Sequence, residues 1–272
     1  MIKALFFDLD GTLLNSKKVI SDKTRTTLIK CKEKGIKLFV ATARFPLLDQ
    51  SLSWNGDTLN IFDGGSYYNG GCIKIDGIKK YFPISMDIVK NIVEYTCEYD
   101  KLNITLQLEH EIHAFRFPLE DIDYKTWGVN TGQIITFDQV KNQNTVKILI
   151  FYANLIDSNI MIDEKLVALL RQYCKNKAQF SLTDKGKVIQ IMAKSADKLS
   201  GIEKIRKILK IKKDELAVFG DDFNDMEMLS AYKYSIAMGN AEKEIKDCAK
   251  YTTLDNNNDG VHHAIQNVLQ II

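Results

Sequence analysis

The stretch Ala4-Leu5-Phe6-Phe7-Asp8-Leu9-Asp10-Gly11-Thr12 decides the fold, because in it an apolar run ends at two carboxylates. Apart from one lysine, residues 2–7 are all apolar and include two phenylalanines. Short continuous apolar runs are typical of strands that are buried on both faces, as inside a parallel sheet. Open parallel sheets bind their ligands beyond the carboxyl ends of the strands. The stretch therefore predicts an interior strand with a polar site at its end.

The residues that follow predict a strand–helix–strand crossover. Ser21 can cap a helix that ends at Gly35, and residues 36–41 form a second apolar run. A similar alternation returns late in the chain, with a helical period at residues 199–209 and an apolar strand at 216–219. Short links between such elements favour right-handed parallel crossovers. We therefore expect an α/β fold with a doubly wound parallel sheet of the Rossmann-like type.

The middle of the chain has a different pattern, in which strands predominate. Apolar runs predict strands at residues 104–109, 112–117 and 146–152, and a helical period follows at 162–174. Such a mixture indicates a separate α+β module inserted into the sheet domain. We expect the sheet domain at residues 1–75 and 188–272, and the inserted module at residues 76–187.

Composition limits the classes of partner. Lys and Arg number 37 against 35 Asp and Glu, so bulk charge gives no reason to expect a nucleic-acid partner. The five cysteines are scattered and form no CxxC pair, which is typical of reduced thiols in a cytosolic protein. No apolar segment approaches the roughly 18 residues that span a bilayer, and the amino terminus does not match a signal peptide. We expect a cytoplasmic protein without a membrane partner.

Acidic residues follow the predicted sheet strands. Asp8 and Asp10 come after the first strand, Thr42 after the second, and Asp221 and Asp225 after the strand at 216–219. If these strands are neighbours, at least three carboxylates converge. Two unit charges about 4 Å apart repel by about 4 kcal/mol at an effective dielectric constant near 20. Oxygen ligands without nearby histidine or cysteine favour a hard cation, Mg²⁺ before Zn²⁺.

The motif Asp8-Leu9-Asp10-Gly11-Thr12 also fits covalent phosphoryl chemistry. On this interpretation Asp8 is the nucleophile, and Asp10 protonates the leaving oxygen and then activates water. Gly11 lets the backbone turn closely, and Thr12 orients the loop and is a candidate for substrate binding. The structural alternative is a strand-to-loop turn in which the aspartates only accept hydrogen bonds from local amides.

These residues resemble the haloacid dehalogenase superfamily, and within it the Cof-type phosphatases with a large α+β cap of the C2 type. The likeness covers essentially the whole chain. It rests on the motif at 8–12, Ala41-Thr42-Ala43-Arg44, Lys198, and Gly220-Asp221-Asp222-Phe223-Asn224-Asp225, supported by Asn69-Gly70-Gly71 and Met238-Gly239-Asn240-Ala241. The family usually has glycine at the position of Ala43, so the resemblance leaves the shape of that loop open.

The resemblance implies a Mg²⁺ cofactor. It assigns Asp8 and Asp221 as side-chain ligands of the metal and Asp10 as a ligand through its backbone carbonyl. Asp225 would act through water or through hydrogen bonds to the ligands.

The resemblance also implies roles around the phosphoryl group. The Thr42 hydroxyl would hold this group, and Lys198 would offset negative charge on it and on Asp8. Arg44 and Asn224 are candidates for substrate binding, with bracing of their loops as the alternative for each.

The function expected from these features is hydrolysis of a small phosphate monoester, with the cap selecting the substrate. Sugar phosphates, phosphorylated cofactors and nucleotides all fit this class. A phosphomutase-type phosphotransferase and a non-catalytic phospho-ligand-binding module are the alternatives. We expect a monomer or weak dimer; neither the natural substrate nor the pathway follows from the sequence.

Overall fold

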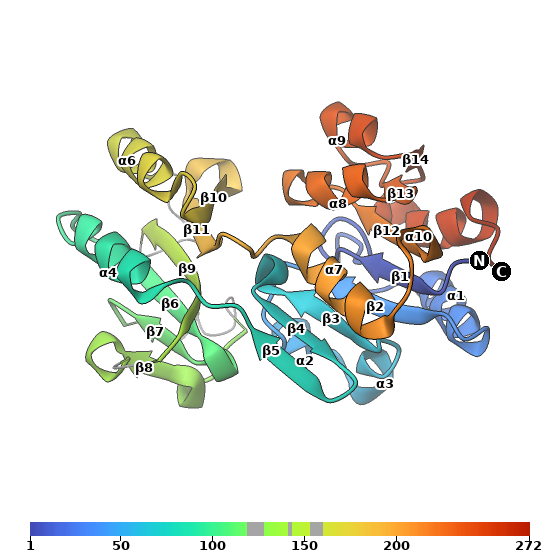
Figure 1. Cartoon of the computed structure of the whole chain (residues 1–272), viewed down its shortest axis with the longest axis horizontal. Coiled ribbons are helices and arrows are strands. Elements are labelled where there is room, and N and C mark those ends of the chain that lie inside the picture. The colour runs from blue at the N-terminus through green and yellow to red at the C-terminus, as the bar shows by residue number, and fades with distance from the viewer. Residues whose placement is uncertain (119–127, 141–142, 153–159) are drawn as a thin grey trace. The chain divides into compact units, whose positions relative to one another are not determined.

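The chain folds into two compact units. The computed structural model describes residues 1–118, 128–140, 143–152 and 160–272. The first unit comprises Met1–Lys80 and Asp197–Ile272, and the second comprises Tyr81–Ala196 (Figure 1). Both boundaries lie further along the chain than the expected 75/76 and 187/188. The strand Val188–Ala193 in particular belongs to the second unit, because it pairs with strands on both sides there.

The first unit is built on an eight-stranded sheet in which β1 has an interior position. The strand order is β14-β13-β12-β1-β2-β3-β4-β5. Neighbours from β14 to β3 pair in parallel, and β4 turns back antiparallel to β3. This order confirms the expected α/β class. Its strands are β1 Ala4–Phe7, β2 Lys37–Ala41, β3 Gly64–Tyr67, β4 Cys72–Ile75, β5 Ile78–Tyr81, β12 Leu216–Gly220, β13 Tyr234–Ala237 and β14 Tyr251–Thr252.

The interior position of β1 follows from its side chains. All four residues of the strand are fully buried, as expected for a strand covered on both faces. The Phe6 ring stacks on Phe39 of β2 with centroids 4.9 Å apart, and the Phe7 ring lies 4.8 Å from that of Phe219 in β12. Aromatic pairs on both neighbouring strands thus hold β1 between them.

The helices of the first unit begin and end where local chemistry requires it. The Ser21 side chain accepts a hydrogen bond from the Thr24 backbone and caps α1, which ends just before Gly35. Asp197 caps α7 in the same way through the Ser200 backbone N–H. The helices are α1 Asp22–Glu33, α2 Leu48–Ser51, α3 Gly56–Leu59, α7 Lys198–Leu209, α8 Met226–Ala231, α9 Lys243–Cys248 and α10 Gly260–His263.

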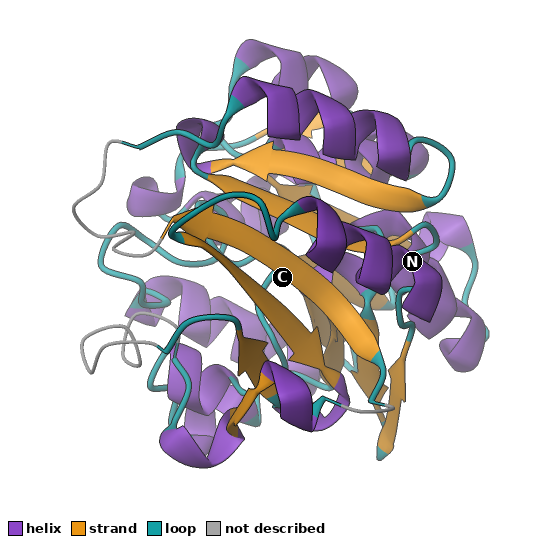
Figure 2. Cartoon of the chain, turned by 90° about the vertical axis from the view of Figure 1, so that its left-hand side faces the viewer, coloured by secondary structure: helices purple, strands orange, loops and turns teal. Residues whose placement is uncertain are grey.

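The second unit is a six-stranded sheet of order β10-β11-β9-β6-β7-β8, antiparallel except between β7 and β8 (Figures 1 and 2). Helices α4 and α6 share one hydrophobic core with the strands. The elements are α4 Met86–Tyr95, β6 Leu102–Leu108, β7 His113–Phe115, β8 Ile134–Thr136, β9 Thr145–Tyr152, α6 Glu164–Cys174, β10 Ala178–Thr183 and β11 Val188–Ala193. Among the described residues of both units, no helix combines the length and the apolar character needed to cross a membrane.

Candidate active site

Three neighbouring strands bring the candidate residues of the first unit together. Asp8 follows β1, Thr42 follows β2 and Asp221 follows β12, and β1 lies between the other two strands. Carboxylate oxygens of Asp8, Asp221 and Asp225 lie within 4.8 Å of one another. Parallel strands end at the same edge of a sheet, which explains how residues more than 200 positions apart meet.

Lys198 lies inside this group of carboxylates. Its Nζ donates to Asp8 Oδ1 at 2.6 Å and to Asp225 Oδ1 at 2.6 Å. The residue is only 2% exposed, and it is the first residue of α7. Burial lowers the pKa of the ammonium, but Asp225 and Asp8 outweigh burial and raise the pKa. Lys198 is therefore a buried cation that two carboxylates keep protonated.

Lys198 alone does not neutralise the acidic group formed by Asp8, Asp221 and Asp225. Burial raises the pKa of Asp8, Lys198 opposes this rise, and Asp225 and Asp221 add to it. Burial likewise raises the pKa of Asp221 to about 7, although the Thr12 hydroxyl donates to it. A further cation would stabilise these crowded carboxylates, because a nearby positive charge favours their ionised form.

The donor set fits a hard metal ion. Asp8 and Asp221 supply carboxylate oxygens, which Mg²⁺ prefers, and the group contains no histidine or sulfur donor. Within the described part of the chain, Asp8 Oδ2 takes part in no hydrogen bond, so it is available as a ligand. The donor set is thus that of a hard, oxygen-ligated cation.

Asp225 has a different place from the other two carboxylates. Its Oδ1 accepts from Lys198, and its Oδ2 accepts from the backbone N–H groups of Asp221 and Asp222 at 2.9 and 3.1 Å. Both oxygens are therefore committed to protein donors. Asp225 holds the Asp221 loop and Lys198 in place, which agrees with an indirect role beside the metal.

The Asp221 carboxylate is positioned by contacts from two loops. Thr12 Oγ1 donates to its Oδ1 at 2.7 Å, and Asn240 Nδ2 donates to its Oδ2 at 3.2 Å. Thr12 is 1% exposed. This contact places the Thr12 hydroxyl on Asp221, which favours the orienting role expected for it over substrate binding.

The Asp10 side chain lies outside the acidic group, in an ion-pair cluster. Arg44 donates to it through Nε at 2.7 Å and Nη2 at 2.8 Å, and Lys18 Nζ donates at 2.7 Å. Burial acts to raise the pKa of Asp10, but Arg44 and then Lys18 outweigh it and lower the pKa to about 2. Asp10 is therefore ionised in this arrangement, which suits a base, and an acid role requires that the Arg44 pair be broken.

Thr42 and Ala43 form a tight loop after β2. The Thr42 Oγ1 accepts from the Arg44 backbone N–H at 3.1 Å, and Thr42 is 1% exposed. Ala43 has no left-handed backbone conformation, whereas such conformations do occur elsewhere in the described chain. The loop therefore tolerates alanine where the resembled family usually has glycine.

Two asparagines connect the Thr42 loop to the Asp221 loop. The Asn69 backbone N–H donates to the Thr42 carbonyl at 2.9 Å, and Asn224 Nδ2 donates to Asn69 Oδ1 at 3.3 Å. Asn224 Oδ1 is buried and has no hydrogen-bond partner in the described structure. These contacts favour loop bracing for Asn224, and the unsatisfied oxygen leaves one acceptor next to the site.

Sequence reasoning missed one residue of the site, Lys18. It lies in the polar loop after the first motif, beside another lysine, and nothing in its spacing marks it. Only the tertiary position of its ammonium, on Asp10 Oδ1, reveals the contact. The sequence indicates Asn69 and Asn240 only as members of two segments that support the family resemblance.

Comparisons with known proteins point to one family of hydrolases. A family profile described as haloacid dehalogenase-like hydrolase matches residues 5–265. A Haemophilus influenzae protein, named provisionally as a phosphatase, is 28% identical over 96% of both chains. A Bacillus subtilis phosphatase named for 5-amino-6-(5-phospho-D-ribitylamino)uracil is 26% identical over 93% of both chains. The solved structure of a subclass IIB sugar phosphatase superposes with a TM-score of 0.80 at 26% identity, covering 99% of this chain and 100% of the other.

Proposed function

The chain belongs to the haloacid dehalogenase-like hydrolases and is a phosphatase of that family, and we propose that it hydrolyses a small phosphate monoester through a covalent phospho-aspartate on Asp8. The observation that carries this proposal is the position of Lys198, whose buried ammonium joins Asp8 to Asp225 beside Asp221. A carboxylate nucleophile needs cationic groups around it, because the phosphoryl group that it attacks is itself negatively charged.

In the first step Asp8 attacks phosphorus and the ester P–O bond breaks. The leaving oxygen takes a proton from Asp10, which must first collect that proton after leaving the Arg44 pair. Thr42 donates a hydrogen bond to the transferring group, and Lys198 offsets the charge that develops near Asp8. Asp10 thereby ends the step ionised.

In the second step water attacks the phospho-aspartate. Asp10 accepts a proton from the water, the bond between phosphorus and Asp8 breaks, and inorganic phosphate leaves. The pairing of Asp10 with Arg44 and Lys18 supports its ionised form, as a base requires. Asp10 thus ends the cycle protonated, as it was when it began the first step, and can protonate the next leaving oxygen.

We propose Mg²⁺ as the cofactor, held by the side chains of Asp8 and Asp221 and the backbone carbonyl of Asp10. When bound, the ion supplies positive charge to the carboxylates and to the phosphate oxygens. Asp225 and Thr12 would keep the Asp221 ligand in position through the hydrogen bonds described above.

We propose a small metabolite as the substrate, either a sugar phosphate, a phosphorylated cofactor or a nucleotide. Two similar proteins support this class, since one is named a sugar phosphatase and another is named for a phosphorylated ribitylaminouracil. The second unit would choose among such esters. We further propose a monomer or weak dimer in the cytoplasm, in agreement with the free state of all five cysteines.

The test is a screen of metabolite esters with Mg²⁺, with release of inorganic phosphate as the readout. We expect turnover by the wild type, none by Asp8→Asn or Asp10→Asn, and a phosphorylated Asp8 peptide in acid-quenched wild-type samples analysed by mass spectrometry. Mg²⁺ binding should survive in Asp10→Asn, because that residue offers the metal a backbone oxygen. Exposed Asp57, changed to asparagine, is the matched control.

Three results would contradict the proposal. Phosphate release by Asp10→Asn at the wild-type rate would remove its acid and base roles. Release that requires a bisphosphate activator would instead identify a phosphomutase-type transferase. Tight binding of phosphate esters without any turnover would indicate a binding module.

A further inference from the structure

The second unit contains a cavity that the proposed phosphatase chemistry does not use. Its volume is about 460 Å³, within the range of small-molecule sites. It opens between α4, the turn at Phe137–Gln139 and the start of β9. None of its lining residues belongs to the acidic group of the first unit. The described lining lies entirely within the second unit, so the cavity is a candidate site of that unit.

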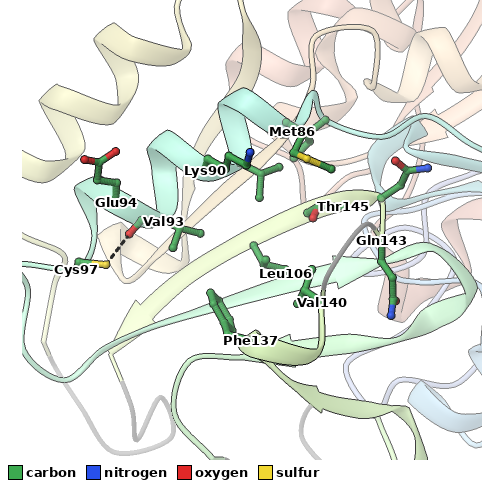
Figure 3. A pocket seen from close by; sticks show the side chains of 13 residues that line it. Met86, Lys90, Val93, Glu94, Cys97, Leu106, Phe137, Val140, Gln143 and Thr145 are labelled. Atoms are coloured by element: carbon green, nitrogen blue, oxygen red, sulfur yellow. Dashed lines mark hydrogen bonds between the residues drawn. The ribbon is translucent and has the colours of Figure 1, made fainter.

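The cavity reaches into the hydrophobic core of the second unit. Ile84 and Leu106, which are 4% and 3% exposed, are core residues that line it. Val93, Phe137 and Val140 are partly buried and pack against the same core. Figure 3 shows Val93, Leu106, Phe137 and Val140 turned toward one shared space. Its interior is apolar, so an apolar group would gain by entering it.

Helix α4 presents more apolar surface than its protein neighbours cover. Ile92 is fully buried in the core, and the Tyr95 ring meets Tyr173 of α6 with centroids 5.2 Å apart. Val89 and Val93 lie on the part of the helix that lines the cavity, as does Met86, which is 45% exposed. Val89 and Val93 thus pack only partly against the core and also face the cavity.

The polar groups of the lining favour an anion over a cation. The Lys90 ammonium and the Gln143 side-chain amide have no hydrogen-bond or ion-pair partner among the described residues. Glu94 also lines the cavity, but its carboxylate points away from the space between Val93 and Phe137 (Figure 3). The Asn144 amide donates to Glu109 at 3.3 Å. Among the described lining residues, the unpaired charge that remains for a ligand is that of Lys90.

We propose that this cavity binds a small monoanionic molecule that joins an apolar ring or branched chain to a carboxylate. The apolar part lies between α4 and Phe137, and the carboxylate pairs with Lys90. Such a ligand matches the two features that the described lining residues show, an apolar interior and the ammonium of Lys90. The proposal is independent of the phosphatase function.

Phenylacetate is the probe, with phenylethanol and phenylethylamine as its neutral and cationic analogues. We expect saturable binding of phenylacetate to the full chain in amide NMR titrations, with shifts in α4 and in residues 137–140 and 143–145. Phenylethanol should bind more weakly, and phenylethylamine should not bind. Lys90→Gln should weaken the binding of phenylacetate by about fivefold and leave the affinity for phenylethanol unchanged, because only the charge is lost.

Val93→Phe fills the cavity without adding charge, so it should remove binding of both phenylacetate and phenylethanol. Its folding is checked by the same spectra. Failure of phenylacetate to saturate, or equal affinity in wild type and Lys90→Gln, would overturn the proposal. A concentration-dependent dimer that Val93→Phe abolishes, seen by sedimentation velocity, would also overturn it, since a second copy would then be the occupant.

Discussion

Gly11 has to be glycine because its neighbour across the site is Asp221. Its φ is +88°, and a Cβ built there would lie 2.1 Å from Asp221 Oδ2. Gly35 has a similar φ of +78°, but nothing lies within 4 Å of its Cβ position. Alanine substitutions at the two positions therefore distinguish the effect of backbone strain from that of a steric clash.

Gly11→Ala is expected to abolish Mg²⁺ binding and turnover, because the methyl group displaces the Asp221 carboxylate. Gly35→Ala should lose only about 1 kcal/mol of stability, from left-handed backbone strain, and should keep full activity. Calorimetric Mg²⁺ titration and urea unfolding of both variants make the comparison. Wild-type Mg²⁺ affinity in Gly11→Ala would show that Asp221 is not a ligand.

Lys198→Met should cost both stability and rate. The change leaves Asp8 and Asp225 buried without their shared cation, a situation that costs about 3–5 kcal/mol. It should also lower kcat by at least about 100-fold, as expected for loss of a charge-stabilising group. The loss of stability in urea should shrink with added Mg²⁺, because the ion takes over part of the neutralisation.

The control for Lys198 is Lys207→Met, on the exposed side of the same helix. This variant should match the wild type in both measurements. If Lys198→Met lost stability but kept its kcat, the lysine would be a structural residue only.

The sequence predicted the site residues that directly follow buried strands. Asp8, Thr42 and Asp221 are found from the apolar runs before them, since the end of a strand fixes where the next residue lies. The ion pair between Arg44 and Asp10 could not be found in this way. It depends on how two flexible side chains meet across 34 positions, which no local pattern records.

At the scale of elements, the buried His113 in β7 gives the second unit a measurable response to acid. The residue is 0% exposed, and burial lowers its pKa from 6.5 to about 4. The unfolded chain therefore binds a proton at a higher pH than the folded chain does. Stability due to this group is complete above pH 6.5 and is lost as the pH falls toward 4.

His113→Gln is expected to reduce this loss of stability between pH 6.5 and 4, by about 3 kcal/mol near pH 4. Urea unfolding of wild type and variant across the window measures the difference in slope. Asp8 and Asp221 have raised pKa values and act in the opposite direction, so only the comparison isolates His113. Equal slopes for wild type and His113→Gln would refute the burial argument.

The elements that the sequence predicted are those with continuous apolar runs or a clear helical period. Strands β1, β2, β9 and β12 and helices α1 and α7 are of this kind. Strand β3 was missed, because Gly-Gly-Ser-Tyr carries almost no apolar pattern and its pairing comes from the neighbouring strand β2. Strand β5 was missed because two lysines in its centre give an exposed edge strand a polar sequence.

At the scale of the whole molecule, the second unit has what independent folding requires. It is one continuous segment, Tyr81–Ala196, with a core of its own between the sheet and helices α4 and α6. We expect a fragment of residues 81–196 to fold alone and to unfold cooperatively in urea. Circular dichroism and amide NMR check this, and a fragment of residues 1–80 is the contrasting case, expected to stay unfolded because β12 and α7 are missing. A fragment 81–196 without cooperative unfolding would show that the two units depend on each other.

The interior position of β1 also has a consequence for synthesis. Its partner on one side, β12, begins only at Leu216, so a ribosome adding 5–20 residues per second completes that pair on the order of 10–40 s after β1 is made. During this time β1 lacks its neighbour β12, and the Phe7 ring lacks its contact with Phe219, while the inserted segment is finished earlier. A nascent chain of this protein should therefore need a chaperone at its oldest strand rather than at its newest.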